Sequence, residues 1–169
     1  VVRSAASQAQ PLARGQRIAV AGAGRPMTVV GDRNYLERAL VNLLTNAIIY
    51  APGTDRIDVR LEVCDGDAVV HVTDYGPGLA SDDVAAQTTR AFYQAPWANR
   101  PSRGGLGLGL YLTSEFARLH GGRLDVQSAP GQGSTFSLVL PLAEERIRET
   151  VSAPGRLREP SPRKIAAAP

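Results

Sequence analysis

The chain has 169 residues, 43% of them hydrophobic and 21% charged, so it can bury a core and is most simply one domain with tails. Its 19 basic and 16 acidic residues leave a net charge of only +3, which is spread out with few aromatic residues and argues against a nucleic-acid surface. The lone cysteine excludes an intrachain disulfide and fits a reducing cytoplasm, and no apolar run is long enough to span a membrane.

The N-terminal part is predicted to contain two short strands after an irregular start. Residues 1–15 are expected to be a linker, or a short helix that ends a preceding helical region, weakened by Pro11. Residues 16–21 and 26–31 have strand-like patterns and are joined by a Gly-rich turn. Because its only methionine is Met27, we expect the chain to be a piece of a larger protein.

Residues 32–53 carry the strongest helical signal. Asp32 is placed to cap the start, and a Pro-Gly pair stops the helix. The apolar face consists of Leu36, Leu40, Leu43, Leu44, Ala47, Ile48 and Ala51. Asn42 and Asn46 lie four residues apart on the other side of that face. They form either a solvated polar stripe or a ligand site, since amide oxygens suit Mg²⁺ and its phosphates.

The second half of the chain is predicted to complete a sheet. Residues 56–64 and 67–74 alternate as two strands joined by an Asp-Gly turn. Residues 107–120 form a second helix, and residues 122–128 and 133–140 a closing hairpin. Paired strands with two long helices predict an α+β fold, a two-layer sandwich with one mixed sheet and helices on one face.

Two segments lack a regular pattern. Residues 75–106 are rich in turn residues, and a gap of that length is either functional or disordered, so we expect residues 80–106 to be mobile. Residues 142–169 are rich in Arg, Glu, Pro and Ala and are predicted to be a disordered tail. The folded domain is therefore expected to span residues 16–141.

Asp74 is the most informative acidic residue. By strand parity it lies on the side of Val70 and Val72, which is the predicted core face, where a carboxylate needs a hydrogen-bond partner. It is either a turn-initiating Asp or the acceptor of a ligand amine, such as the exocyclic amine of adenine. Gly76 and Gly78 would let a flat ring approach the backbone closely.

The segment GGLGLGL, residues 104–110, places glycines directly before a helix. Glycines and the free amides of a helix start can hold phosphate. The spacing is neither that of a Rossmann fingerprint nor that of a P-loop. Phosphate charge would therefore be met by Mg²⁺, backbone amides and arginine, for which Arg100 and Arg103 are candidates.

Taken together, these motifs resemble the ATP-binding domain of sensor histidine kinases, within the GHKL or Bergerat-fold superfamily of gyrase, MutL and the heat-shock chaperones. NLLTNAIIY resembles the N box, DYGPG the G1 box, AFYQA the F box and GGLGLGL the G2 box. The resemblance covers roughly residues 16–141, and four boxes in the correct order make it specific.

The resemblance implies an ATP site with Mg²⁺. Asn46 would ligate the metal and Asn42 would lie beside the phosphates, so these two are the implied catalytic residues. Asp74 would pair with adenine in a pocket shaped by Gly76 and Gly78. The other implied ATP-binding residues are Tyr50, Arg103, Gly105, Gly107, Leu108, Gly109 and Ser134.

The resemblance also implies partners. The γ-phosphoryl of ATP would pass to a histidine on a separate helical dimerisation domain and from there to a response regulator. His71, on the strand face opposite Asp74, and His120, at a helix end, are interpreted as structural. The chain is thus expected to be the cytoplasmic catalytic part of a longer membrane-anchored sensor, with no nucleic-acid partner and no membrane insertion of its own.

Two other functions stay open. Kinases of this kind often carry a basic residue at Ile49 and at Gln94, and Ser or Thr at Leu106, so each departure removes a phosphate contact and favours a nucleotide-sensing module without phosphoryl transfer. A gyrase- or chaperone-type ATPase usually has a hydrolytic Glu at the position of Asn42. Without that base we expect the isolated chain to bind Mg-ATP and hydrolyse it very slowly.

Overall fold

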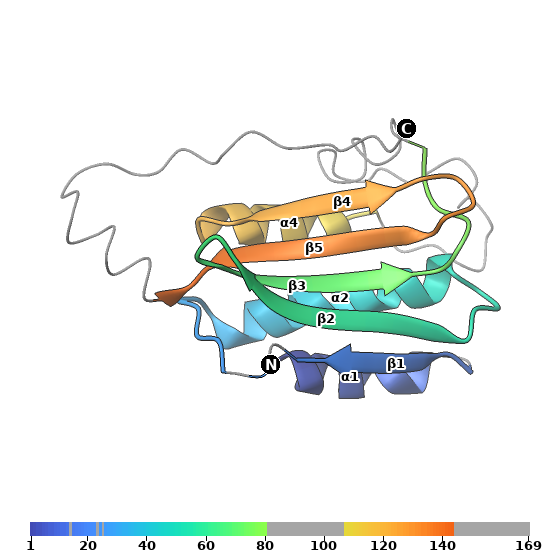
Figure 1. Cartoon of the computed structure of the whole chain (residues 1–169), viewed down its shortest axis with the longest axis horizontal. Coiled ribbons are helices and arrows are strands. Elements are labelled where there is room, and N and C mark those ends of the chain that lie inside the picture. The colour runs from blue at the N-terminus through green and yellow to red at the C-terminus, as the bar shows by residue number, and fades with distance from the viewer. Residues whose placement is uncertain (14, 23, 25, 81–106, 144–169) are drawn as a thin grey trace.

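The computed structural model describes residues 1–13, 15–22, 24, 26–80 and 107–143. They form a two-layer α+β sandwich, in which helices cover one face of a five-stranded sheet (Figure 1). The strand order is β1-β2-β3-β5-β4. β1 is parallel to β2 and the other neighbours are antiparallel, so the predicted mixed sheet is confirmed.

The helices are α1 (Val2–Ala9), the 3-10 turn η1 (Gln10–Leu12), α2 (Arg33–Tyr50) and α4 (Gly109–Leu119). The strands are β1 (Arg17–Ala21), β2 (Arg56–Cys64), β3 (Asp67–Asp74), β4 (Arg123–Ser128) and β5 (Ser134–Pro141). For every element after η1, the ends lie within about three residues of the predicted ones. Local periodicity therefore accounts for the elements that build the sandwich.

Helix α2 begins where the sequence predicts. The Asp32 carboxylate accepts hydrogen bonds from the backbone N–H groups of Asn34 and Tyr35, at 2.7 and 3.2 Å, and so caps the first turn. The apolar side of α2 faces the sheet, and Leu43 and Ala47 are almost fully buried there. This packing holds the asparagine-bearing side of the helix in one orientation relative to the sheet.

The core lies between the helices and the inner face of the sheet. Ile57 and Leu138 are fully buried in its centre. Residues 2–9, for which the sequence left a helix or a linker open, form α1, and Ala5 and Ala9 of this helix are completely buried in the same core. Small side chains on α1 let it pack close to its neighbours.

The prediction of a second strand at residues 26–31 is wrong. Among these residues only Val29 pairs with another segment, through an isolated bridge to Leu142. Pro26 has no N–H to donate to a strand ladder. The segment instead passes from the end of β1 to the start of α2.

The first two residues of the predicted tail are attached to the sandwich. Leu142 donates its backbone N–H to Gly66, and Ala143 donates to Thr28, at 3.1 and 2.9 Å. Residues 81–106 and 144–169, where a mobile segment and a disordered tail were predicted, lie outside the described residues. Within the part of the chain that is described, none of the helices combines the length and apolarity needed to cross a membrane.

Candidate functional site

Asp74 ends β3 on the inner face of the sheet, as strand parity predicts. Its side chain is buried, with 3% of the residue exposed. Burial raises the pKa of Asp74, and hydrogen bonds from the Gly76 N–H and from the backbone and hydroxyl of Ser134 partly oppose that rise. The carboxylate is therefore oriented by uncharged donors only, and it keeps lone pairs for a further donor.

A small cavity lies beside this carboxylate. It is lined by Asn46, Tyr50, Asp74, Gly78, Leu79, Ser134 and Phe136. Five of these seven residues were predicted site residues, and they come from α2, β3, β5 and the turn after β3. The volume is about 10 Å³, enough for about one water molecule, so a nucleotide base would enter only if the walls moved apart.

Two glycine-containing turns form one wall of the site. A Cβ atom on Gly78 would lie 2.0 Å from the carbonyl oxygen of Ala129, and one on Gly133 would lie 2.2 Å from the carbonyl oxygen of Asp74. Both glycines also have left-handed φ angles, +69° and +74°. The turn after β3 and the turn between β4 and β5 are thus in direct backbone contact.

The same turn rests on the end of α2. A Cβ atom on Gly76 would lie 2.8 Å from the carbonyl oxygen of Tyr50 and equally close to Cα of Ala51. Burial also raises the pKa of the Tyr50 phenol. Only a residue without a side chain allows this approach, so the predicted base-pocket glycine is required for the packing of the turn against α2.

Ser128 is a site residue that sequence reasoning missed. Its hydroxyl accepts a hydrogen bond from the Leu79 N–H at 2.7 Å and donates to the Gly133 carbonyl at 2.9 Å. It also lies 3.0 Å from the Ser134 hydroxyl. Ser128 therefore joins the two turns beside Asp74. The only sequence signal was its position at the end of a strand, before a Pro-Gly turn.

The predicted phosphate-binding residues are partly described. Gly107 has a left-handed φ of +68°, Leu108 is the N-cap of α4 without a side-chain cap, and Gly109 begins the helix. The first amides of α4 therefore have no side-chain cap. Arg103 and Gly105, together with Arg100, Gln94 and Leu106, lie outside the described residues.

Asn42 and Asn46 lie on successive turns of α2. Asn46 lines the cavity, whereas Asn42 donates a hydrogen bond from Nδ2 to the hydroxyl of Thr113, at 3.1 Å. Among the described residues no group of three or more His, Cys, Asp or Glu side chains would hold a metal ion. Mg²⁺ at Asn46 would take its remaining oxygen ligands from water and phosphate, which this ion readily accepts.

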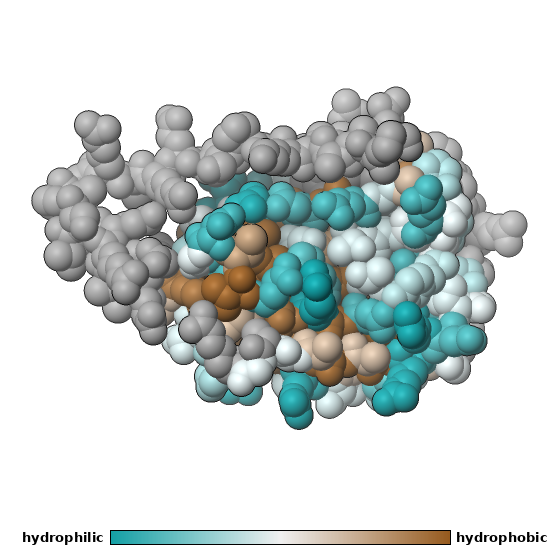
Figure 2. All heavy atoms as spheres, viewed as in Figure 1, coloured by the Kyte–Doolittle hydropathy of each residue, from teal (hydrophilic) through white to brown (hydrophobic). Residues whose placement is uncertain are grey.

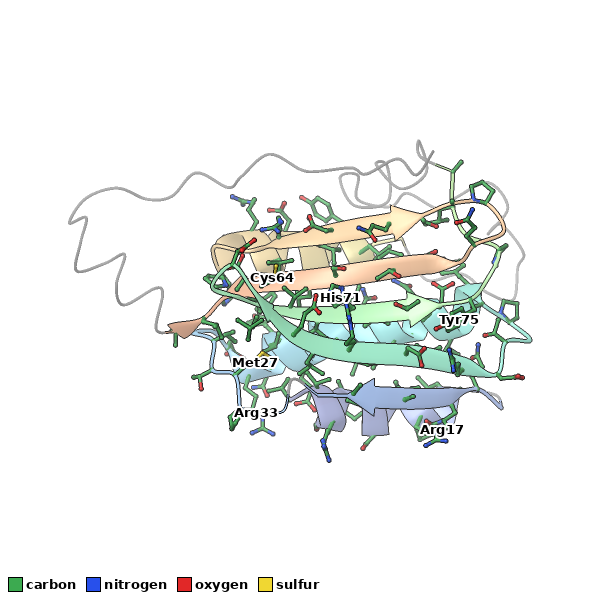
Figure 3. The ribbon with its side chains drawn as sticks, in the orientation of Figure 1. Arg17, Met27, Arg33, Cys64, His71 and Tyr75 are labelled. Carbon is green, nitrogen blue, oxygen red and sulfur yellow. The ribbon has the colours of Figure 1, made fainter. Side chains whose placement is uncertain are left out.

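The uncovered face of the sheet has a different composition. Figure 2 shows it as a mixture of hydrophilic and apolar side chains, and Figure 3 places His71 near its middle. His71 Nδ1 lies 2.8 Å from the Ser137 hydroxyl, and Nε2 lies 2.9 Å from the Glu62 carboxylate. The hydrogen bond between His71 and Glu62 is the main cause of the lowered pKa of Glu62. His120 is the C-cap of α4, so neither histidine lines the cavity beside Asp74.

Comparison with known proteins identifies relatives for this arrangement. A family model described as histidine kinase-, DNA gyrase B-, and HSP90-like ATPase matches residues 31–144. The sensor-like histidine kinase SenX3 of Mycobacterium tuberculosis is 36% identical over 134 residues, which are 79% of this chain and 32% of SenX3. The sensor histidine kinase MtrB of Mycobacterium leprae is 36% identical over 136 residues, 78% of this chain and 23% of MtrB.

Solved structures are similar as well. The mycobacterial sensor histidine kinase MprB superposes with a TM-score of 0.71 at 29% identity, covering 83% of this chain and 91% of that chain. Full-length ShkA in complex with AMPPNP gives a TM-score of 0.73 at 30% identity, covering 84% of this chain and 29% of ShkA. The chain thus spans about a third or less of the curated relatives described above.

Proposed function

The chain belongs to the family of histidine kinase-, DNA gyrase B- and HSP90-like ATPases, and on that premise we propose that it is the ATP-binding catalytic part of a sensor histidine kinase. Its role would be to bind Mg-ATP and present the γ-phosphoryl to a histidine on another domain. Such transfer depends on positioning and on neutralising phosphate charge rather than on covalent chemistry by the protein.

The observation that carries the proposal is the cavity beside Asp74. It joins the α2 asparagine to a buried carboxylate, in a wall built from closely packed glycines. A buried carboxylate with only uncharged partners is a strong acceptor for the amine of adenine. Ser134 and Ser128 would hold this acceptor and the adjoining turns in place.

The other residues have assigned roles in the same proposal. Asn46 would ligate Mg²⁺, and Asn42 would lie beside the phosphates. Gly107, Leu108 and Gly109 would offer amides to the phosphates at the start of α4, with Gly105 and Arg103 contributing from the preceding segment. Tyr50, Gly76 and Gly78 would shape the base pocket. Bound Mg²⁺ would supply charge neutralisation for the phosphates.

The partners follow from the reaction class. The acceptor would be a histidine on a helical dimerisation domain of the parent protein, and the phosphoryl group would then pass to a response regulator. The chain would act in the cytoplasm, as part of a membrane-anchored sensor. A nucleotide-sensing module is the second candidate, favoured by Ile49 at the end of α2, where related kinases often carry a basic residue.

The test combines this chain, Mg-ATP and a separately produced helical hairpin that carries the acceptor histidine. Labelled, acid-labile phosphate on the hairpin is expected, because in-line transfer needs only a bound nucleotide and a positioned acceptor. A hairpin with histidine replaced by glutamine is the control for the acceptor.

The other outcomes separate the alternatives. Mg-ATP binding without any transfer would favour the nucleotide-sensing module. Phosphate release by the chain alone at about 10 s⁻¹, the order of a typical enzyme, would favour the ATPase. No binding of Mg-ATP would overturn all three assignments.

A further inference from the structure

Asn42 makes a side-chain contact with a residue 71 positions away. Its Nδ2 donates to the hydroxyl of Thr113, which lies on the second turn of α4 and is almost fully buried, with 2% of the residue exposed. All buried side-chain nitrogens and oxygens within the described part of the chain have a hydrogen-bond partner. The contact joins α2 directly to the helix that follows the predicted phosphate-binding glycines.

The backbone of Gly109 contacts the oxygen end of the same amide. A Cβ atom on Gly109 would lie 1.9 Å from Oδ1 of Asn42, so the amide oxygen rests against the bare backbone at the start of α4. Gly109 and Thr113 are four residues apart and therefore stack on one side of α4. Together they contact both ends of the Asn42 amide.

This arrangement places the Asn42 amide between α2 and the start of α4. The amide of an asparagine has a donor end and an acceptor end that are nearly the same size, so packing alone does not distinguish them. Nδ2 donates to the Thr113 hydroxyl, and Oδ1 lies against the backbone of Gly109 at the start of α4. On the proposed function, that end of α4 meets the phosphates and their metal.

We propose that Thr113 is a positioning residue for nucleotide binding: its hydroxyl holds the Asn42 amide against the start of α4, at the phosphate end of the site. This assignment rests on the proposed function. It also makes Thr113 a link between α2 and α4, because loss of the hydroxyl would remove the hydrogen bond that holds the Asn42 side chain.

The experiment measures the affinities of this chain for Mg-ATP and for adenosine, which has no phosphates. Thr113→Val keeps the shape of the side chain but removes the hydroxyl, and Thr113→Ser keeps the hydroxyl. We expect Thr113→Val to weaken Mg-ATP binding about three- to tenfold, the range for one neutral hydrogen bond, and to leave adenosine binding unchanged. Thr113→Ser should bind both ligands like the parent chain.

A double-mutant cycle with Asn42→Ala separates positioning from mere stability. If Thr113 acts through Asn42, Thr113→Val has no further effect on Mg-ATP affinity once Asn42 is alanine. An equal loss in the presence and absence of Asn42, or an equal loss for adenosine, would overturn the assignment. Thr113→Ala serves in the same cycle if the valine variant does not fold.

The result also separates this assignment from the proposed function. If the parent chain binds Mg-ATP and Thr113→Val binds it equally well, only the role of Thr113 is overturned. If the parent chain does not bind Mg-ATP, the proposed function is overturned and the role of Thr113 with it.

Discussion

The two faces of strand β3 differ in the surroundings that they give to a carboxylate: one buries it and the other leaves it partly exposed beside a histidine. On the inner face Asp74 is buried, its hydrogen-bond donors are uncharged, and burial raises its pKa. On the outer face Glu62 of the neighbouring strand pairs with His71 in a partly exposed position, and that hydrogen bond lowers the pKa of Glu62. Both groups are on the same sheet, and His71 and Asp74 are only three residues apart.

The difference shows how a sheet separates a charge that is already paired from a buried charge whose hydrogen-bond donors are uncharged. The outer-face carboxylate already has a cationic or hydrogen-bonding neighbour from its own sheet, and solvent screens the pair, so little is left for a ligand. The inner-face carboxylate has been removed from water without an opposite charge among its hydrogen-bond donors. A hydrogen bond from a ligand would therefore stabilise this buried carboxylate more than the outer one.

The largest expected effect is on the contact that shapes the inner face. Gly78→Ala would force a left-handed φ on alanine and push its Cβ into the Ala129 carbonyl, so we expect a loss of about 2–4 kcal/mol in the free energy of unfolding. Gly53→Ala is the matched control, because Gly53 has φ +82° but an added Cβ there would meet no atom within 4 Å. That change should cost about 1 kcal/mol. Equal urea midpoints for the two variants would contradict the role of the turn contact.

The next effect is on affinity. Asp74→Asn keeps the shape and an oxygen acceptor but removes the charge, so we expect ATP binding to weaken by about 1.5–3 kcal/mol, or about tenfold to hundredfold. Isothermal titration with the folded variant would measure it. Glu62→Gln makes the same chemical change on the outer face and should bind ATP like the parent chain. A similar loss in both variants would remove the distinction between the faces.

A smaller, pH-dependent effect sharpens the comparison. The pKa of Asp74 is raised in the folded chain, so the free energy of unfolding should fall as pH rises from the unfolded pKa towards the folded one. On the proposed function the ionised carboxylate is the better acceptor for adenine, so ATP affinity should fall as pH drops below the folded pKa, towards the affinity of the Asp74→Asn variant. This loss of ATP affinity should begin at a pH above the ordinary pKa of an aspartate side chain. Asp74→Asn should lack this component of the profile.

The smallest effect is expected for Glu62→Gln on stability. The pKa of Glu62 is lowered in the folded chain, so its stabilising contribution is present above its unfolded pKa and is lost as pH falls through the folded one. Thermal unfolding should show a slight difference between variant and parent at neutral pH and none in acid. A difference that grew on acidification would contradict the assigned hydrogen bond.

Local patterns in the sequence determined most of the sandwich. The cap at Asp32, the helical spacing in α2 and the alternation in β2 and β3 depend on neighbours a few residues away, so they can be read without the fold. The same alternation placed Asp74 and His71 on opposite faces. The predicted strand at residues 26–31 failed because a strand also needs a partner, and only Val29 finds one.

The tertiary structure alone decided how the site is held together. Ser128 meets Leu79 across 49 residues, and Thr113 meets Asn42 across 71. No periodicity in either segment encodes such a partner, because a single hydroxyl leaves the local pattern of a strand or a helix unchanged. These contacts exist only because packing of the whole sandwich brings the end of β4 to the turn after β3, and α2 to α4, within hydrogen-bond distance.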